Sequence, residues 1–171
     1  MNSSRGAVEL AAVFLSLGSN LGDRKANIRE ALSRLSANSD IQLKDISSLY
    51  ETAPIGYADQ PDFINAVACV RTDLSPIDLF YAIVEIESGM GRVRNFHWEP
   101  RVIDIDILFY DHVEMDAPEL TIPHPRMMER AFVIAPLAEI VPNMILPNGR
   151  KPEEVLMKLA DQQVRKLAEE E

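Results

Sequence analysis

The sequence predicts an α+β fold in which two helices pack on one antiparallel sheet. The 171 residues suffice for a single domain, and no internal repeat or linker divides them. Apolar segments with strand or helix periodicity follow one another in the order β-α-β-β-α-β. The second and third strands are adjacent in the chain, which favours an antiparallel sheet over a doubly wound parallel one. This order matches the ferredoxin-like, split βαβ arrangement.

The first strand and the first helix have clear sequence signals. Residues 11–17 (AAVFLSL) form an apolar run that predicts a buried strand, and residues 18–23 are mainly turn formers. A helix should follow, with Asp23 as its N-cap. Its apolar residues recur at i, i+3, i+4 and i+7, at Ile28, Ala31, Leu32 and Leu35.

The next two strands flank a loop. Residues 41–50 alternate in two registers, which predicts a strand that contains a bulge. Prolines and a glycine indicate a loop over residues 52–62, and residues 63–71 predict the third strand.

The second helix leads into a loop and the fourth strand. Ser75 and Pro76 place a hydroxyl cap and a proline at the start of this helix, and Gly89 and Gly91 end it. Residues 92–100 lack periodicity and carry several charges, so we expect a mobile loop. Residues 102–110 predict the fourth strand.

The remaining sequence is rich in proline. We expect a short turn or hairpin near residues 111–115, short helical pieces within 127–140 and a final helix from Pro152. Residues 1–10 should form a disordered extension, residues 11–160 the domain, and residues 161–171 a frayed C-terminal tail.

Composition excludes several classes of function. The net charge of −10 argues against a broad nucleic-acid-binding face. No apolar run approaches the roughly 20 residues that span a bilayer, and the N-terminus does not resemble a secretory signal. Cys69 is the only cysteine, so no intrachain disulfide forms. We expect a cytoplasmic protein, monomeric, without membrane or nucleic-acid partners.

Two aspartates in the fourth strand predict a metal site. Because side chains of a strand alternate, Asp104 and Asp106 share one face, with Cα atoms about 6.6 Å apart. The apolar residues Ile103, Ile105, Ile107 and Phe109 should share the other face. Paired carboxylates repel unless a cation neutralises them, and Mg²⁺ commonly takes one or two carboxylates together with phosphates and water. The alternative is an ordinary solvated face of a strand.

Arginines lie close to these acids in the sequence. Arg92 and Arg94 precede them within the expected loop, and Arg101 directly precedes the strand. Acids that bind metal, together with arginines from a mobile loop, suit transfer of a phosphoryl-type group. The chain has neither a GxxxxGK[ST] phosphate loop nor the HRD and DFG motifs of protein kinases. The turn at residues 18–22 precedes a helix, but we interpret it as structural and not as a phosphate cradle.

A second set of residues suits a flat heteroaromatic ligand. Phe63 and Asn65 share one face of the third strand and offer a ring beside an amide. A core phenylalanine and an asparagine at a strand end would look the same. His124 and Phe132 are equally ambiguous by themselves, whereas Trp98 in a charged loop fits a lid that closes over a ligand.

Several motifs in order along the chain resemble the 6-hydroxymethyl-7,8-dihydropterin pyrophosphokinase family. They cover about residues 13–147, nearly the whole chain. The most specific are the DQPDFIN segment at residues 59–65 and the PRVIDID segment at residues 100–106. The others are LSLGSNLGD, YETAPIG, GRVR, IPHP and RAF, beginning at Leu15, Tyr50, Gly91, Ile122 and Arg130.

The resemblance implies a folate-biosynthesis enzyme that transfers the β,γ-diphosphate of ATP to the pterin hydroxymethyl group and releases AMP. It implies two Mg²⁺ ions on Asp104 and Asp106, and phosphate contacts from Arg92 and Arg101. The implied pterin-binding residues are Thr52, Ile55, Phe63, Asn65, Trp98 and Phe132. The implied ATP-binding residues are Glu87, Arg92, Arg94, Arg101, Ile107, Thr121, His124 and Arg130.

The chain departs from the family's usual pattern at a few positions. Glu99 stands where a glycine usually precedes Pro-Arg, and the segment from Arg92 to Trp98 looks one residue shorter. Glu119 and Pro125 stand where arginine and tyrosine are expected. Two other functions use some of the same features: another two-metal phosphate enzyme, such as a nucleotidyltransferase or phosphohydrolase, or a ferredoxin-like binding module without catalysis.

Overall fold

The computed structural model describes residues 9–53, 59–91 and 101–169. The predicted N-terminal extension, up to residue 8, and the predicted loop at 92–100 lie outside the described residues. The elements, in chain order, are β1 (Ala11–Ser19), α1 (Arg24–Ala37), β2 (Ile41–Ile46), β3 (Tyr50–Thr52), β4 (Phe63–Thr72), α2 (Pro76–Gly89), β5 (Asp104–Tyr110), β6 (Met115–Asp116), β7 (Thr121–Ile122), η1 (Met127–Glu129), α3 (Ala131–Ile140), α4 (Pro152–Met157) and β8 (Val164–Lys166).

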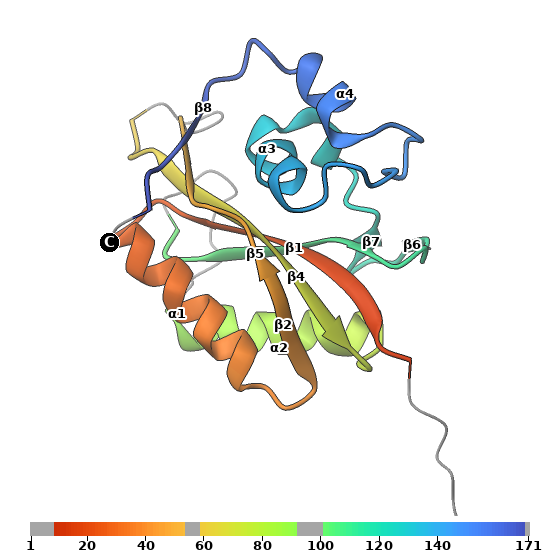
Figure 1. Ribbon diagram of the computed structural model, residues 1–171. Coiled ribbons are helices and arrows are strands. Elements are labelled where there is room, and N and C mark those ends of the chain that lie inside the picture. The colour runs from red at the N-terminus through yellow and green to blue at the C-terminus, as the bar shows by residue number, and fades with distance from the viewer. Residues whose placement is uncertain (1–8, 54–58, 92–100, 170–171) are drawn as a thin grey trace, which may run out of the picture.

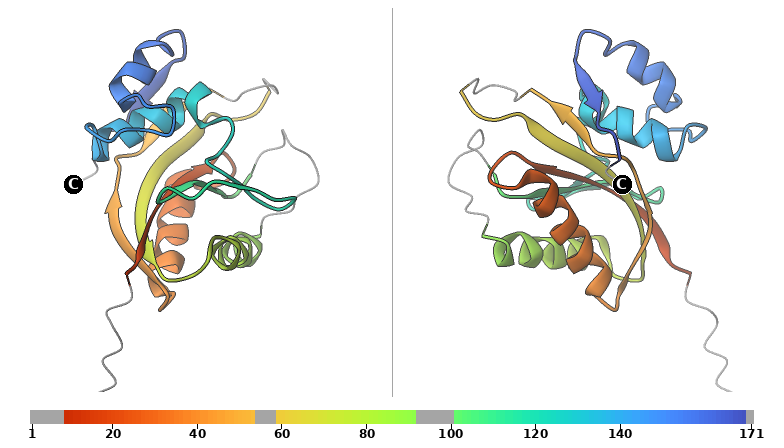
Figure 2. Two further views of the ribbon diagram at one scale, coloured as in Figure 1. Left: turned by 90° about the vertical axis from the view of Figure 1, so that its right-hand side faces the viewer. Right: turned by 60° about the vertical axis from the view of Figure 1, so that its left-hand side comes forward.

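The main sheet lies between two layers of helices. Its strands follow the order β5-β1-β4-β3-β8, with β2 also paired to β4, and every pairing is antiparallel. Figure 1 shows α1 and α2 on one face of the sheet and α3 with α4 on the other; the views in Figure 2 agree. The predicted α+β, ferredoxin-like βαββαβ fold is confirmed. The short pair β6-β7 forms a separate hairpin over residues 115–122, later in the chain than the turn or hairpin expected near residues 111–115.

The strand predicted over residues 41–50 is two strands. β2 and β3 both pair with β4, and the chain leaves the sheet between them at residues 47–49. At this break, Ser47 supplies hydrogen-bond partners for the backbone of Val67 in β4. Its N–H donates to Val67 O, and its Oγ accepts from Val67 N at 2.9 Å. The predicted bulge is confirmed, as a register shift between Leu43 and Asp45.

A second bulge changes the faces of β5. Ile107 pairs with Leu15, but Phe109 pairs with Phe14, so Leu108 is an extra residue. The prediction that Phe109 shares a face with the isoleucines is therefore wrong. Phe109 stacks on Phe14, with ring centroids 4.7 Å apart, on the sheet face that carries the aspartates. A period of two predicts the faces of a strand only up to its first bulge.

Both predicted N-caps are confirmed. The Asp23 carboxylate accepts a hydrogen bond from Ala26 N at 3.1 Å, and Ser75 Oγ accepts one from Asp78 N at 3.2 Å. These bonds satisfy first-turn N–H groups that have no partner within the helix. Ile28, Ala31 and Leu35 of α1 are fully buried against the sheet, as the periodicity predicted.

The C-terminal segment differs from the prediction. Part of residues 161–171, expected to fray, forms β8, which pairs with β3 from Tyr50↔Lys166 to Thr52↔Val164. The helix predicted from Pro152 is present as α4, with Glu153 and Glu154 in its first turn. Within the described ranges, every helix is too short or too polar to cross a lipid bilayer.

Candidate active site

Strand register brings the predicted site residues together from distant parts of the sequence. Across β4, β1 and β5, one row reads Asn65↔Gly18↔Asp104, and a neighbouring row ends Ser16↔Asp106. Residues opposite one another in antiparallel strands lie with Cβ atoms about 4.5–5.5 Å apart and share a face. The amide and both carboxylates therefore lie on one face of the sheet. This face lies toward α3, because the charges of Asp104 and Asp106 act on Arg130 at the start of that helix.

Gly18 leaves space in the middle of this row. A Cβ atom at this position would lie 3.0 Å from Asn65 Oδ1 and 3.6 Å from Phe63 Cδ1. The turn-forming residues 18–23 predicted a turn at Gly18, but β1 extends to Ser19, so this glycine is inside a strand. A glycine within a strand commonly marks the close approach of another group. The glycine was visible in the sequence, but the turn-forming residues that follow it made a turn the more natural interpretation.

Asn65 presents a buried amide to this space. Its side chain is 3% exposed, and its Nδ2 has no hydrogen-bond partner among the described residues. A buried donor without a partner costs about 1–3 kcal/mol, so such groups are rare unless a ligand or water satisfies them. Phe63, two residues earlier on the same face, is half-buried. The predicted combination of an aromatic ring beside an amide is therefore present.

The two aspartates are half-buried and side by side on β5. Asp104 Oδ2 accepts a hydrogen bond from Arg101 Nη1 at 3.0 Å. The Asp104 side chain is 22% exposed and the Arg101 side chain 20%. Among the described residues, no cluster of three or more His, Cys, Asp or Glu side chains could hold a metal ion. A pair of carboxylates fits Mg²⁺, which commonly takes one or two carboxylates together with phosphates and water.

Asn20 connects the two halves of the site. This fully buried residue accepts a hydrogen bond from Arg101 N at its Oδ1, at 2.7 Å, and its backbone N–H donates to Arg101 O at 3.0 Å. Its Nδ2 donates to Gln60 Oε1 at 2.7 Å and to Pro61 O at 3.2 Å. No sequence motif predicted this linking role for Asn20. Its contacts are spread over 81 residues of sequence, so no local pattern could reveal them.

The start of α3 lies near the carboxylates. The Arg130 guanidinium carbon is 5.5 Å from the centroid of the Phe132 ring. Burial lowers the pKa of Arg130, while the nearby Asp106 and Asp104 carboxylates act to raise it. Burial and then Arg130 lower the pKa of His124, against the opposing effect of Asp104. Arg130 therefore lies near both aspartates and His124 near Asp104, while Phe132 lies beside Arg130.

The other predicted residues occupy different positions. Glu87 on α2 is 1% exposed, and its Oε2 accepts from Ile105 N at 3.0 Å, which holds the backbone of the edge strand β5 between the two aspartates. Ile107 is buried on the opposite face from the carboxylates. Thr121 lies on β7, where its Oγ1 is 3.5 Å from Asp116 Oδ1. Their roles toward ATP stay predictions.

Thr52 lies at the end of β3 opposite Phe63, and its Oγ1 donates to Gln163 O at 3.3 Å. The predicted residues Ile55, Arg92, Arg94 and Trp98 lie outside the described residues.

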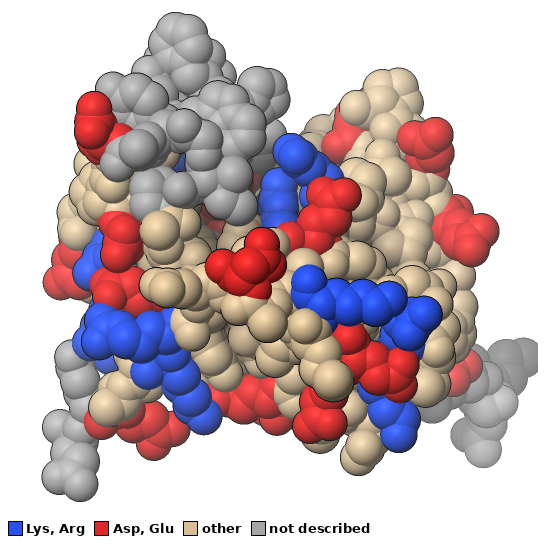
Figure 3. All heavy atoms as spheres, turned by 90° about the horizontal axis from the view of Figure 1, so that it is seen from above, with Lys and Arg blue, Asp and Glu red and all other residues tan. Residues whose placement is uncertain are grey.

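Charge on this side of the molecule is mixed. Seen from the side of α3 and α4, basic and acidic side chains are interspersed, without a broad positive surface (Figure 3). This agrees with the net charge of −10 and with cations that act locally, as Arg101 does beside Asp104.

Comparison with known proteins places the chain in one family. Residues 14–142 match the model of the 7,8-dihydro-6-hydroxymethylpterin-pyrophosphokinase family. The chain is 43% identical to the 2-amino-4-hydroxy-6-hydroxymethyldihydropteridine pyrophosphokinase of Pseudomonas aeruginosa, over 84% of this chain and 89% of that protein. It is 40% identical to the Haemophilus influenzae protein of the same name, over 92% of this chain and 99% of that protein.

A solved structure shows the same fold. A crystal structure of Plasmodium falciparum HPPK-DHPS aligns with a TM-score of 0.68 and 15% identity, over 91% of this chain and 47% of that one. The chain thus spans about half the length of this larger protein. The family match, the two curated relatives and the arrangement of the site agree: the chain belongs to the 7,8-dihydro-6-hydroxymethylpterin-pyrophosphokinase family.

Proposed function

We propose that the described face of the sheet carries out the diphosphate transfer of this family, with the pterin between Gly18 and Phe132 and the phosphates beside Asp104. Family membership makes the chain an ATP-dependent pyrophosphokinase of folate biosynthesis. The reaction moves the β,γ-diphosphate of ATP to the hydroxymethyl oxygen of 6-hydroxymethyl-7,8-dihydropterin and leaves AMP. The row Asn65↔Gly18↔Asp104 supports the proposal, because it brings a buried amide without a described partner, an open position at a glycine and a carboxylate next to one another.

The pterin site uses the unsatisfied amide. Asn65 Nδ2 would donate to an acceptor on the pterin edge, which removes the cost of leaving it buried without a partner. The absence of a side chain at Gly18 lets the flat ring approach the sheet. Phe63 and Phe132 would contact the two ring faces, and the backbone near Thr52 would bind its edge. Two aromatic faces and a few fixed hydrogen bonds are typical of sites for small heteroaromatic ligands.

The phosphate site uses the carboxylate pair and nearby cations. Asp104 and Asp106 would hold two Mg²⁺ ions through oxygen ligands, and the bound ions would neutralise charge on the transferred group. Arg101 and Arg130 add positive charge at this place, and Arg101 is held in position through its backbone by Asn20. Such fixed charges stabilise a transition state without having to reorganise during the reaction. Arg92 stays a predicted phosphate ligand from outside the described residues.

An AMP-release assay tests the proposal. The chain should form AMP from ATP only with Mg²⁺ and the hydroxymethylated dihydropterin both present. ADP or free phosphate as the product would favour a different two-metal phosphate enzyme, and no turnover would favour a binding module. We also propose a monomeric, cytoplasmic enzyme, and light scattering during size-exclusion chromatography tests the oligomeric state.

A further inference from the structure

Gln162 links the C-terminal segment to the start of α3. Its Nε2 donates a hydrogen bond to Glu129 O at 2.7 Å, and its Oε1 accepts one from Ala131 N at 2.9 Å. These two backbone groups lie on either side of Arg130. One side-chain amide therefore holds the main chain both before and after this arginine.

This contact replaces a missing helix cap. Arg130 occupies the N-cap position of α3, and no side chain at this position makes a capping hydrogen bond. The first N–H groups of a helix have no partner within the helix and need an acceptor from elsewhere. Gln162 supplies one to Ala131 N from 31 residues along the chain. The orientation of the first turn of α3 thus depends on a remote residue.

The groups held in this way belong to the substrate site proposed above. Phe132 is the second residue of α3, and the Arg130 guanidinium lies 5.5 Å from its ring centroid. Arg130 is also close enough to Asp106 and Asp104 for their charges to act on its pKa. A small rotation of the first turn would move the aromatic ring and the cation together.

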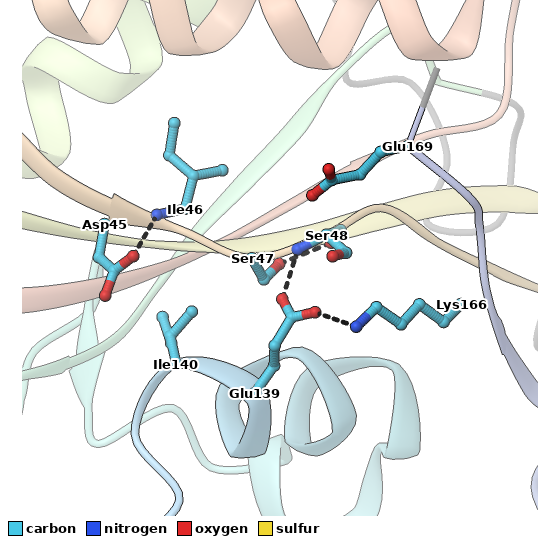
Figure 4. A pocket seen from close by; sticks show the side chains of 8 residues that line it. All are labelled: Asp45, Ile46, Ser47, Ser48, Glu139, Ile140, Lys166 and Glu169. Carbon is cyan, nitrogen blue, oxygen red and sulfur yellow. Dashed lines mark hydrogen bonds and ion pairs between the residues drawn. The ribbon is translucent and has the colours of Figure 1, made fainter. Parts of the chain in front are cut away.

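The same C-terminal segment also contacts β3 and the far end of α3. Gln163 O accepts the hydroxyl of Thr52 at 3.3 Å, and β8 pairs along the whole of β3. Lys166 Nζ is 2.8 Å from Glu139 Oε1 near the end of α3; Figure 4 shows this pair in a groove of about 440 Å³ between α3, β2 and the C-terminal residues. Residues 162–166 therefore connect α3 to β3, the strand that pairs with Phe63 and Asn65 of β4.

We propose that Gln162 is a positioning residue for the pterin site, which sets the place of Phe132 and Arg130 relative to the sheet. The inference rests on the proposed roles of Phe132 and Arg130. Its physical basis is preorganisation: a binding site whose groups are already in place loses less freedom when the ligand binds. Loss of Gln162 should therefore weaken substrate binding even in a fully folded protein.

The test compares Gln162→Met and Gln162→Glu in the full chain. Methionine keeps the length of the side chain but removes both hydrogen bonds, whereas glutamate keeps an acceptor for Ala131 N. Gln162→Met should weaken binding of 6-hydroxymethyl-7,8-dihydropterin about tenfold, equivalent to about 1.4 kcal/mol. Gln162→Glu should weaken binding of the same ligand clearly less than Gln162→Met does. Calorimetric titration measures the Kd at a temperature where circular dichroism shows each variant fully folded, and Gln42→Met, on the exposed edge of β2, is the matched control.

A double-mutant cycle with Phe132→Ala separates the possible failures. If Gln162 acts through Phe132, adding Gln162→Met to Phe132→Ala should weaken pterin binding less than twofold further. Unchanged pterin affinity in Gln162→Met, while Phe132→Ala binds poorly, would overturn the role of Gln162 alone. Full additivity of the two losses would also overturn it. Unchanged affinity in Phe132→Ala would overturn the assignment of the site, and the inference with it.

Discussion

Gly18→Ala should separate pterin binding from stability. Gly18 is not among the described glycines with positive φ, so alanine fits the backbone. Alanine in a strand interior is favoured over glycine by roughly 0.5–1 kcal/mol. Against this, the new Cβ would lie 3.0 Å from Asn65 Oδ1, so the amide must move by a few tenths of an ångström. These two effects oppose each other, and we expect the free energy of unfolding to change by less than about 1 kcal/mol.

Binding should change much more than stability. The methyl group would occupy the space between Asn65 and Asp104, and it would displace the amide that we propose donates to the pterin. Loss of one buried hydrogen bond that leaves its partner unsatisfied costs about 1–3 kcal/mol, so the Kd should rise roughly 5- to 150-fold. Calorimetric titration with 6-hydroxymethyl-7,8-dihydropterin measures the Kd, and urea denaturation measures the unfolding free energy.

The control for this experiment is Gly89→Ala at the end of α2. Its new Cβ would also meet a side chain, Arg34 Nη1 at 2.6 Å, but at the flexible end of an arginine away from the proposed site. Pterin affinity should be unchanged in this variant. If Gly18→Ala bound the pterin as tightly as the unsubstituted protein, the space at Gly18 would not be the ligand site. A large loss of stability in Gly18→Ala would show that the Asn65 amide cannot move aside for the new Cβ atom.

Three further predictions concern the metal, the pH dependence and the buried link. Asp104→Asn and Asp106→Asn should each lower Mg²⁺-dependent AMP formation by at least about 100-fold, with pterin affinity changed less than threefold, because each removes charge from the proposed metal site; a retained rate would refute the metal role. His124 has a folded-state pKa below its unfolded value of about 6.5, so the unfolded state takes up the proton first and stability falls as pH drops below about 6.5. His124→Gln should therefore lose less in Tm between pH 7 and pH 5 than the unsubstituted chain, and an equal loss would contradict this. Asn20→Ala leaves the partly buried Arg101 N without its side-chain acceptor and should lower the unfolding free energy by about 1–3 kcal/mol. It should also weaken ATP binding. Unchanged Tm and ATP affinity would count against the role of Asn20 in linking the two halves of the site.

Short-range signals were reliable where local chemistry decides the outcome. Asp23 and Ser75 cap their helices as predicted, because an N-cap satisfies N–H groups only two or three residues away. The shared face of Asp104 and Asp106 was also predicted correctly, since no bulge lies between them. One bulge further on, at Leu108, the same reasoning failed for Phe109.

The C-terminal tail was predicted wrongly for a related reason. Residues 161–171 are polar and lack a clear period, which is typical of a frayed end. β8 is nevertheless ordered by pairing with β3 and by ion pairs from Arg165 to Glu51 and from Lys166 to Glu139. The partners of these contacts lie far away in the sequence, so the polar tail by itself carries no sign of them.

The sequence alone determined the βαββαβ order of the core, the N-caps of α1 and α2, the paired aspartates and the family resemblance. Each of these depends on neighbouring residues or on the order of motifs, both of which can be read from the sequence. Only the tertiary structure decided that Gly18 opens space between Asn65 and Asp104, that Asn20 joins Gln60 to Arg101, and that Gln162 caps α3. Strand register and side-chain hydrogen bonds across the fold depend on how distant segments pack, and packing is a property of the whole chain.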